Sequence, residues 1–246
     1  MSTARYAIYL APSPDTPLWM FGSRVLGYDA VTGKDVAGFA PSGFDPALWR
    51  HRTERPRTYG FHATLKAPFR LSEKTSLTVL EDELDAFSRI TPPFDLGPLA
   101  VRAIMDGNDG FVALTPLRDT SELVVLERRV VHDFDRFRAP LTDDELRKRD
   151  PDKLTLRQRE SLLSLGYPYV GPDYRFHMTL SGVVPDAVDV ADSLADAMAN
   201  DIGTAHLKVD ALVLFSQGNR AERFRVVRRF DFLGVSPRLT AAAFSP

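Results

Sequence analysis

"YGFHATLKAP" (residues 59–68) is the stretch that decides the fold of this chain, because it returns almost unchanged as "YRFHMTLSG" (residues 174–182). Tyr, Phe, His, Thr and Leu stand in the same order and at the same spacing in both stretches. The two copies are separated by far more than the roughly 20–50 residues of a solenoid repeat. The repeat therefore predicts the duplication of a whole structural unit, with one His-x-Thr motif in each copy.

Each copy has the pattern of a β-strand with one apolar and one polar face, over residues 58–69 and 174–184. Tyr59 and Tyr174 fall on the apolar faces, so we expect them to pack in the core. The polar faces carry His62, Thr64 and Lys66 in the first copy and Arg175, His177, Thr179 and Ser181 in the second. A histidine and a threonine two positions apart are separated by about 6.6 Å along a strand, so one tetrahedral anion can contact both.

The elements after each motif strand repeat as well. Apolar residues three and four positions apart predict a helix over 73–90 after the first copy, and a second helix is expected over 187–202. Two strands are expected after each helix, over 96–105 and 110–117 in the first case and over 206–217 and 223–233 in the second. This order predicts an α+β fold of two pseudo-symmetric lobes. Each lobe would have an antiparallel sheet with helices on its outer face, and the active cleft would lie between the lobes.

The remaining segments complete one bilobal domain over residues 1–246. A first strand is expected over 5–12 and a helix over 16–27, closed by a glycine. Residues 28–58 are rich in Gly, Pro and Arg, and we expect a long irregular connection there. Another helix is expected over 121–137, followed by a charged helical stretch within 138–168.

The composition is that of an ordinary globular protein. The 246 residues include 31 basic and 33 acidic side chains, so the net charge of −2 provides no overall field for nucleic acid or an anionic membrane. Cysteine is absent from the sequence, which excludes disulfides, thiolate metal sites and cysteine nucleophiles. No apolar run has the length of a signal peptide core or a membrane span, so a cytoplasmic location is expected by default.

The paired motifs "HATL" and "HMTL" resemble those of the 2H phosphoesterase superfamily, which is named for its two His-x-Thr/Ser-x motifs. Longer strings, including "RYAIYLAP", "FRAPLT" and "GYPYV", resemble its DUF1045-like branch associated with phosphonate-utilisation operons. The resemblance covers nearly the whole chain. It implies action on cyclic or linear phosphodiesters without a metal ion, and a small phosphorylated metabolite as the substrate.

Two imidazoles facing one phosphate form an acid–base pair, because their ordinary pKa lies near neutrality. We therefore expect His62 and His177 to be catalytic, one taking a proton from water and the other donating one to the departing oxygen. Thr64 and Thr179 would donate hydrogen bonds to the non-bridging phosphate oxygens. The pseudo-symmetry leaves open which histidine is the acid and which is the base.

Weaker candidates for substrate binding surround these four residues. They are Lys66, Arg138, Tyr167, Tyr169, Arg175 and Ser181. The charges of Lys66 and Arg175 are as readily explained as solvated strand ends. The basic run at 49–57 is either a rim that attracts phosphate or a solvated loop. No cofactor and no metal site are expected, since two strand histidines without neighbouring carboxylates make a poor metal cage.

The sequence thus predicts a metal-independent phosphodiesterase, a phosphoric diester hydrolase, acting on a small phosphorylated substrate such as a nucleotide or ribose cyclic phosphate. An RNA-end enzyme acting on 2′,3′-cyclic phosphates is an alternative, although a long nucleic acid is not expected without an extended basic surface. The other alternative is a module that binds a phosphorylated metabolite without turning it over.

Overall fold

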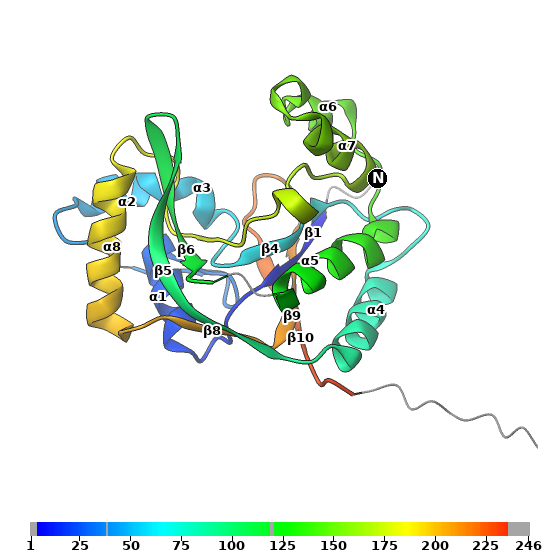
Figure 1. The fold of residues 1–246 in the computed structure, drawn as a ribbon, viewed down its shortest axis with the longest axis horizontal. Helices are drawn as coiled ribbons and strands as arrows, with labels where there is room; N and C mark the ends of the chain where they lie inside the picture. The colour runs from blue at the N-terminus through cyan, green and yellow to red at the C-terminus, as the bar shows by residue number, and fades with distance from the viewer. Residues whose placement is uncertain (1–3, 38, 119–120, 236–246) are drawn as a thin grey trace, which may run out of the picture.

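Eight strands of the computed structural model form one antiparallel sheet in the order β10-β9-β1-β4-β7-β6-β5-β8 (Figure 1). The structure describes residues 4–37, 39–118 and 121–235. The strands are β1 (Arg5–Leu10), β4 (Ala63–Phe69), β5 (Phe94–Asp106), β6 (Asp109–Pro116), β7 (Met178–Thr179), β8 (His206–Val209), β9 (Ala211–Gln217) and β10 (Arg225–Asp231). Two-residue strands β2 (Tyr28–Asp29) and β3 (Lys34–Asp35) pair separately. The fold is therefore a mixed α+β fold with a large antiparallel sheet.

The sheet is strongly curled, and its connectivity requires this. β8 lies at one edge and β9 is next to the last strand at the other, yet only Asp210 separates them in sequence. One residue spans only about 3.5 Å. The two ends of the sheet must therefore approach each other, and buried side chains of the strands and of the covering helices form one continuous core.

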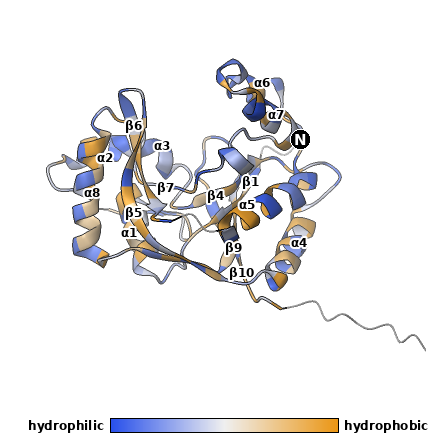
Figure 2. Ribbon diagram, in the orientation of Figure 1, coloured by the Kyte–Doolittle hydropathy of each residue, from blue (hydrophilic) through white to orange (hydrophobic). Residues whose placement is uncertain are grey.

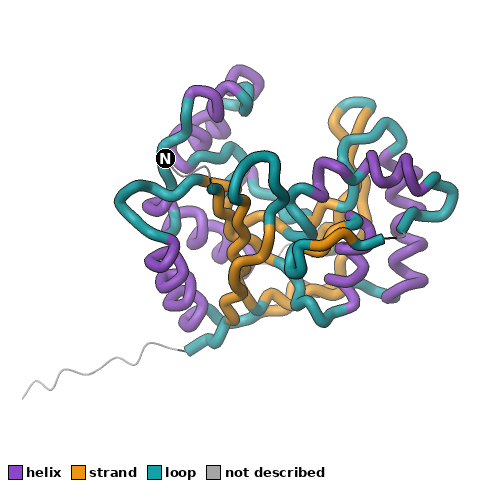
Figure 3. Tube along the Cα trace, turned by 180° about the vertical axis from the view of Figure 1, so that it is seen from behind, coloured by secondary structure: helices purple, strands orange, loops and turns teal. Residues whose placement is uncertain are grey.

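Three long helices cover the curled sheet. Helix α4 (Leu77–Ile90) contacts β9 and β10, α5 (Ser121–Asp133) contacts β4, and α8 (Ala187–Ile202) contacts β5 and β6. Each helix buries one stripe of apolar residues, and Figure 2 shows hydrophobic and hydrophilic positions on the same helices. Seen from behind, the strands lie in the middle with helices at both flanks (Figure 3). No helix of the described segments has the length and apolar character needed to cross a membrane.

Several shorter helices complete the chain. Helix α1 (Pro17–Leu26) contacts α8, and it begins at a capping Thr16 and ends at Gly27 with φ of 70°, as predicted. Helices α6 (Asp143–Arg147) and α7 (Leu156–Leu165) both start with a capping box, and they form an arm above the sheet (Figure 1).

The expected irregular connection over 28–58 is wrong in part. It holds the β2–β3 pair and two helices, α2 (Pro46–Arg52) and α3 (Glu54–Arg57). Asp45 caps α2 through the backbone N–H groups of Ala47 and Leu48, with proline at the first helical position. A sequence rich in turn-forming residues thus conceals short helices that begin at well-formed caps.

The boundaries of the motif strands also differ from the prediction. The first strand begins at residue 63 instead of 58, because Gly60 has φ of 77° and forms a turn ahead of the strand. The second strand covers only Met178–Thr179 instead of 174–184. A 3₁₀ turn at Gly171–Asp173 leads into an extended segment without ladder pairing before residue 178.

The two expected separate sheets are replaced by one continuous sheet. The β5–β6 hairpin follows the first motif strand in sequence but pairs with the second, through β6 and β7. The β9–β10 hairpin follows the second motif strand but lies beside β1, which pairs with the first. Strand exchange between the two halves of the chain therefore brings the motif strands together at the centre of the sheet.

Candidate functional site

The two His-x-Thr motifs lie side by side on β4 and β7. These strands are antiparallel, and Ala63 stands opposite Met178. In an antiparallel pair the neighbours of opposed residues are also opposed, so His62 lies across from Thr179 and Thr64 lies across from His177. All four side chains consequently project from the same face of the sheet.

Both imidazoles are oriented by the same kind of hydrogen bond to a backbone carbonyl. The Nδ1 atom of His62 lies 2.9 Å from the carbonyl oxygen of Gly60, and that of His177 lies 2.8 Å from the carbonyl oxygen of Arg175. A carbonyl oxygen can only accept, so Nδ1 carries the proton in each neutral ring. The Nε2 atoms are then the positions at which protons can be exchanged. The duplicated motif thus orients both histidines through the backbone two residues earlier.

His62 is the more tightly enclosed histidine. Its ring stacks on Tyr9 of β1 with centroids 3.7 Å apart, and the Thr64 hydroxyl lies 3.3 Å from Nε2. Burial, with a smaller contribution from His177, lowers the pKa of His62 to about 4, and the hydrogen bond to the Gly60 carbonyl opposes this shift. The imidazole of His62 is therefore neutral at pH 7 and can accept a proton at Nε2.

A pocket of about 580 Å³ opens over this face of the sheet. His62, His177 and Thr179 line it, whereas Thr64 is not part of the lining and contacts His62. The further lining residues include Arg55, Tyr59, Ile104, Asp106, Asp109, Phe111, Tyr169 and Ser181. The structure therefore gathers both motifs in one concave site of the size that takes a small ligand.

Three aromatic residues of this site were not predicted. Tyr9 stacks on His62, Phe111 of β6 meets the His177 ring edge-on at 5.5 Å, and Tyr59 lines the pocket. Tyr59 was expected in the core, because strand alternation was extended back through residue 59. The turn at Gly60 breaks that alternation and turns Tyr59 toward the pocket. Tyr9 and Phe111 belong to other strands, so no local pattern could have assigned them.

Lys66 and Arg138 are engaged elsewhere, contrary to the expectation that they bind substrate. The Lys66 side chain is only 4% exposed, and its ammonium donates to Asp135 at 3.0 Å and to the Val131 carbonyl at 3.1 Å. Arg138 donates to both oxygens of Asp135, at 2.9 and 3.2 Å. Neither residue lines the histidine pocket. Both cations are therefore structural partners of the Asp135 carboxylate.

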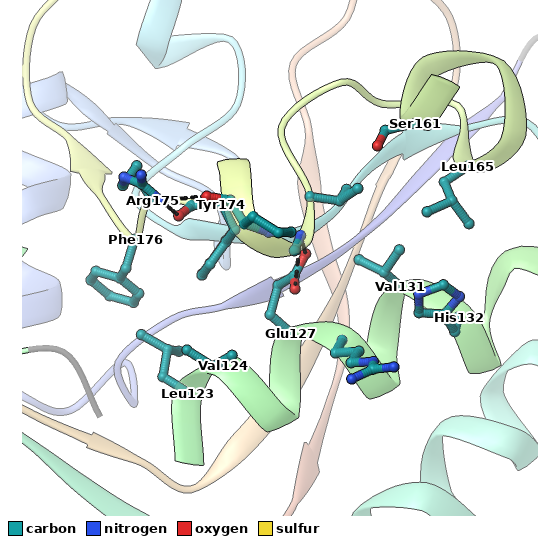
Figure 4. A pocket seen from close by; sticks show the side chains of 14 residues that line it. Leu123, Val124, Glu127, Val131, His132, Ser161, Leu165, Tyr174, Arg175 and Phe176 are labelled. Atoms are coloured by element: carbon teal, nitrogen blue, oxygen red, sulfur yellow. Dashed lines mark hydrogen bonds between the residues drawn. The ribbon is translucent and has the colours of Figure 1, made fainter. Parts of the chain in front are cut away.

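Arg175 lines a different pocket. Its guanidinium donates to the carbonyls of Pro172 and Tyr174, at 2.9 and 2.7 Å. Figure 4 shows Arg175, Tyr174 and Phe176 along one side of this second pocket, of about 640 Å³, with Glu127 of α5 also lining it. The expected sharing of a face by Arg175 and His177 fails because strand pairing begins only at residue 178.

The remaining predicted residues lie nearer the histidines. Tyr169 lines the pocket, and its ring meets that of Tyr167 at 5.6 Å. Ser181 also lines it, but its hydroxyl is committed: it accepts from the Val112 N–H and donates to the Gly182 carbonyl, both at 2.9 Å. Ser181 therefore fixes the strand end, and Tyr169 is the better placed of these residues for a ligand.

The basic run at 49–57 contributes one cation to the pocket, Arg55. Other arginines of the run are bound to protein groups: Arg52 pairs with Asp186 at 2.8 Å, and Arg57 donates to the Leu26 carbonyl at 2.7 Å. Arg55 is exposed and forms no side-chain hydrogen bond or ion pair within the described chain. The rim expected from the sequence is thus reduced to a single free guanidinium.

Comparison with known proteins gives one family and two curated relatives. The profile of DUF1045, described as "Protein of unknown function (DUF1045)", matches residues 64–225. Ribose 1,5-bisphosphate phosphokinase PhnN of Janthinobacterium sp. (strain Marseille) is 36% identical over 242 residues, 96% of this chain and 52% of the relative. The protein of the same name from Laribacter hongkongensis (strain HLHK9) is 36% identical over 224 residues, 91% of this chain and 51% of the relative. The chain spans about half the length of these curated relatives.

These names contradict the expected reaction. Both relatives are named as phosphokinases, which are transferases, whereas the sequence predicted a phosphoric diester hydrolase. The prediction of a phosphodiesterase is therefore wrong, and so is its RNA-end alternative. The resemblance led to a hydrolase because paired histidines serve proton transfer in general, and their presence does not specify which phosphorus–oxygen bond is made or broken.

Proposed function

Because this chain belongs to the DUF1045 family, we propose that its pocket binds a small phosphorylated ribose, and that His62 and His177 exchange protons with it during phosphoryl transfer. The substrate class comes from the names of the relatives, which act on ribose 1,5-bisphosphate. The observation that carries the proposal is the pairing of the two motif strands, with Ala63 opposite Met178, and the presence of His62 and His177 in the lining of one pocket.

The residues divide the chemistry as follows. When a hydroxyl or a monoprotonated phosphate oxygen of the ribose phosphate attacks a phosphoryl donor, a new phosphorus–oxygen bond forms. The bond to the donor's leaving group breaks, and the attacking oxygen gives up its proton. Neutral His62 accepts that proton at Nε2. In its protonated form His177 donates from Nε2 to a phosphate oxygen, the Thr179 hydroxyl donates to another, and Arg55 offsets the negative charge.

We assign only the ribose-phosphate site to this chain. The sequence contains no Gly-rich loop of the Walker type, which is the usual cradle for a nucleoside triphosphate. The curated relatives are about twice as long as the chain. We therefore propose that, in those relatives, the phosphoryl donor is bound by the half that this chain does not match.

The relationship to the 2H phosphoesterase superfamily and the pseudo-twofold duplication belong to this proposal too. Both are supported by the repeated Nδ1–carbonyl device and by the reciprocal exchange of hairpins between the halves. We propose the superfamily's arrangement of histidines for this chain, without the superfamily's hydrolytic reaction.

Calorimetric titration with ribose 5-phosphate tests the binding part of the proposal. His62→Ala and His177→Ala should each weaken binding by roughly tenfold or more, because each removes a polar contact to a charged group. His206→Ala is the matched control, since that histidine is exposed on β8, outside the pocket. Failure of the wild-type chain to bind, or equal affinities in all three variants, would contradict the proposal.

Turnover is tested separately by ³¹P NMR with ribose 1,5-bisphosphate and Mg-ATP, using a protein that contains this chain and the rest of a full-length relative. Loss of product signals in both pocket variants, with the control active, is the expected result. Full activity in both variants would show that the histidines take no part in the transfer.

A further inference from the structure

Two arginines from distant parts of the chain lie near one carboxylate beyond the histidine pocket, and a third, Arg149, acts together with Arg5 on the buried Tyr9. Arg220, between β9 and β10, pairs with Glu145 at 3.1 Å, and Arg5 at the start of β1 lies within electrostatic reach of both. Arg149 follows α6, the helix that carries Glu145. Figure 1 shows the arm of α6 and α7 above the start of β1. The set of Arg5, Arg149 and Arg220 is called the arginine cluster below.

Two series of aromatic contacts, called walls below, run from the histidine pocket to this cluster. On one wall, Tyr59 stacks on Phe224 at 5.3 Å, and the guanidinium of Arg5 lies 5.3 Å from the Phe224 ring. On the other wall, pocket residue Tyr169 contacts Tyr167.

The second wall also ends at an arginine, because the guanidinium of Arg149 lies 5.0 Å from the Tyr167 ring. Both walls therefore start at residues lining the histidine pocket and finish at members of the arginine cluster. Burial raises the pKa of Tyr9, which stacks on His62, while Arg5 and Arg149 both oppose that rise. The field of the cluster thus reaches the ring on which His62 stacks.

Positive charge in the cluster exceeds the negative charge that balances it. Arg5 donates from Nε to the amide oxygen of Gln217 at 2.9 Å, and this partner is neutral. Arg149 forms no ion pair within the described residues. Glu145 is shared between Arg220 and Arg70, whose guanidinium lies 3.2 Å away. One carboxylate therefore faces several guanidinium groups, which leaves a site that favours an added anion.

We propose that Arg5, Arg149 and Arg220 form a second anion subsite, which takes the second phosphate of a bisphosphorylated ligand whose first phosphate lies at His62 and His177. The planar guanidinium fork matches the geometry of phosphate oxygens. Of the aromatic residues between the two subsites, Phe224 is buried, and the partly exposed Tyr167 and exposed Tyr169 provide surface for a sugar ring. This inference rests on the proposed function for its first phosphate position, whereas the cluster itself is independent of that proposal.

Affinities for ribose 1,5-bisphosphate and ribose 5-phosphate test the subsite. Arg149→Ala and Arg220→Ala should each weaken bisphosphate binding by roughly ten- to a hundredfold, the range for a charged hydrogen bond to phosphate. His62→Ala should weaken it as well. The proposed function places the single phosphate of ribose 5-phosphate at the histidines, so both arginine variants should keep their affinity for this ligand, whereas His62→Ala should lose it. Arg89→Ala is the control, because Arg89 is an exposed arginine of α4 paired with Asp85.

The outcomes separate the subsite from the proposed function. Unchanged bisphosphate affinity in both arginine variants, with loss in His62→Ala, would overturn the subsite and leave the proposed function intact. Loss in the arginine variants alone would support the subsite and overturn the histidine site. Absence of bisphosphate binding to the wild-type chain would overturn both. Unfolding midpoints measured for every variant show that affinities are compared between folded proteins.

Discussion

Replacing Asp135 by alanine should destabilise this chain far more than replacing its partner Lys66 by methionine. Burial lowers the pKa of the Lys66 ammonium, and Asp135 counteracts this effect. Without Asp135, the ammonium keeps only the Val131 carbonyl, and a buried charge that loses its partner costs about 3–5 kcal/mol. Without Lys66, the carboxylate keeps both hydrogen bonds to Arg138, and methionine fills the buried volume. We expect that second change to stay within about 1 kcal/mol.

Urea unfolding of the two variants measures this difference, provided that the m-values agree. The affinity for ribose 5-phosphate should be unchanged in Lys66→Met, because the ammonium faces α5 and lies outside the pocket lining. Equal destabilisation by the two substitutions would refute the reasoning about charge balance. A stable Lys66→Met variant that binds the ligand at least tenfold more weakly would instead restore Lys66 as a phosphate ligand.

Three further predictions concern the pocket and its supports. The pKa of His62 is about 4 in the folded chain and near 6.5 in the unfolded chain, so the unfolded chain binds more protons between these two pH values. The free energy of unfolding should therefore fall as the pH drops from about 6.5 to 4. The urea midpoints of the wild type and His62→Gln should converge over that range. Gly60→Ala should lower the free energy of unfolding by roughly 1–3 kcal/mol and weaken ligand binding, because Gly60 has φ of 77° and the new Cβ would lie 2.8 Å from Ala30. The control Gly43→Ala, at φ of 83°, meets no neighbour and should cost less in the same unfolding assay. Ser181→Ala leaves the buried N–H of Val112 without its acceptor and should lower the unfolding free energy by about 1–3 kcal/mol in thermal or urea melts. An unchanged unfolding free energy would contradict this structural role of Ser181.

The sequence predicts best those elements whose pattern is local. The helix expected over 187–202 coincides with α8, and the hairpin expected from strands at 96–105 and 110–117 is β5–β6. In both cases the apolar period and the capping or turn residues lie inside the element itself. The strand expected over 206–217 fails for the opposite reason. It is two strands that pair at different ends of the sheet, and only tertiary pairing separates them at Asp210.

The candidate site divides in the same way. His62, Thr64, His177 and Thr179 were predicted together because a duplicated motif is visible without any structure, and the register of β4 and β7 places them on one face. Lys66 was misplaced because alternation gives the face of a strand but not what packs on it, here Asp135 on the chain after α5. Tyr9 was missed because β1 reaches the site only through its pairing with β4.

The pairing of β4 with β7 has a consequence for how the chain refolds. The two strands join distant parts of the sequence, and β7 is only two residues long, so this seam offers few ladder hydrogen bonds to offset a large loop-closure entropy. Contacts of high sequence separation form late in folding. The β5–β6 hairpin and the long helices are local and can form earlier. We expect far-ultraviolet circular dichroism to recover first in a refolding time course, and affinity for ribose 5-phosphate to return only with the slowest phase.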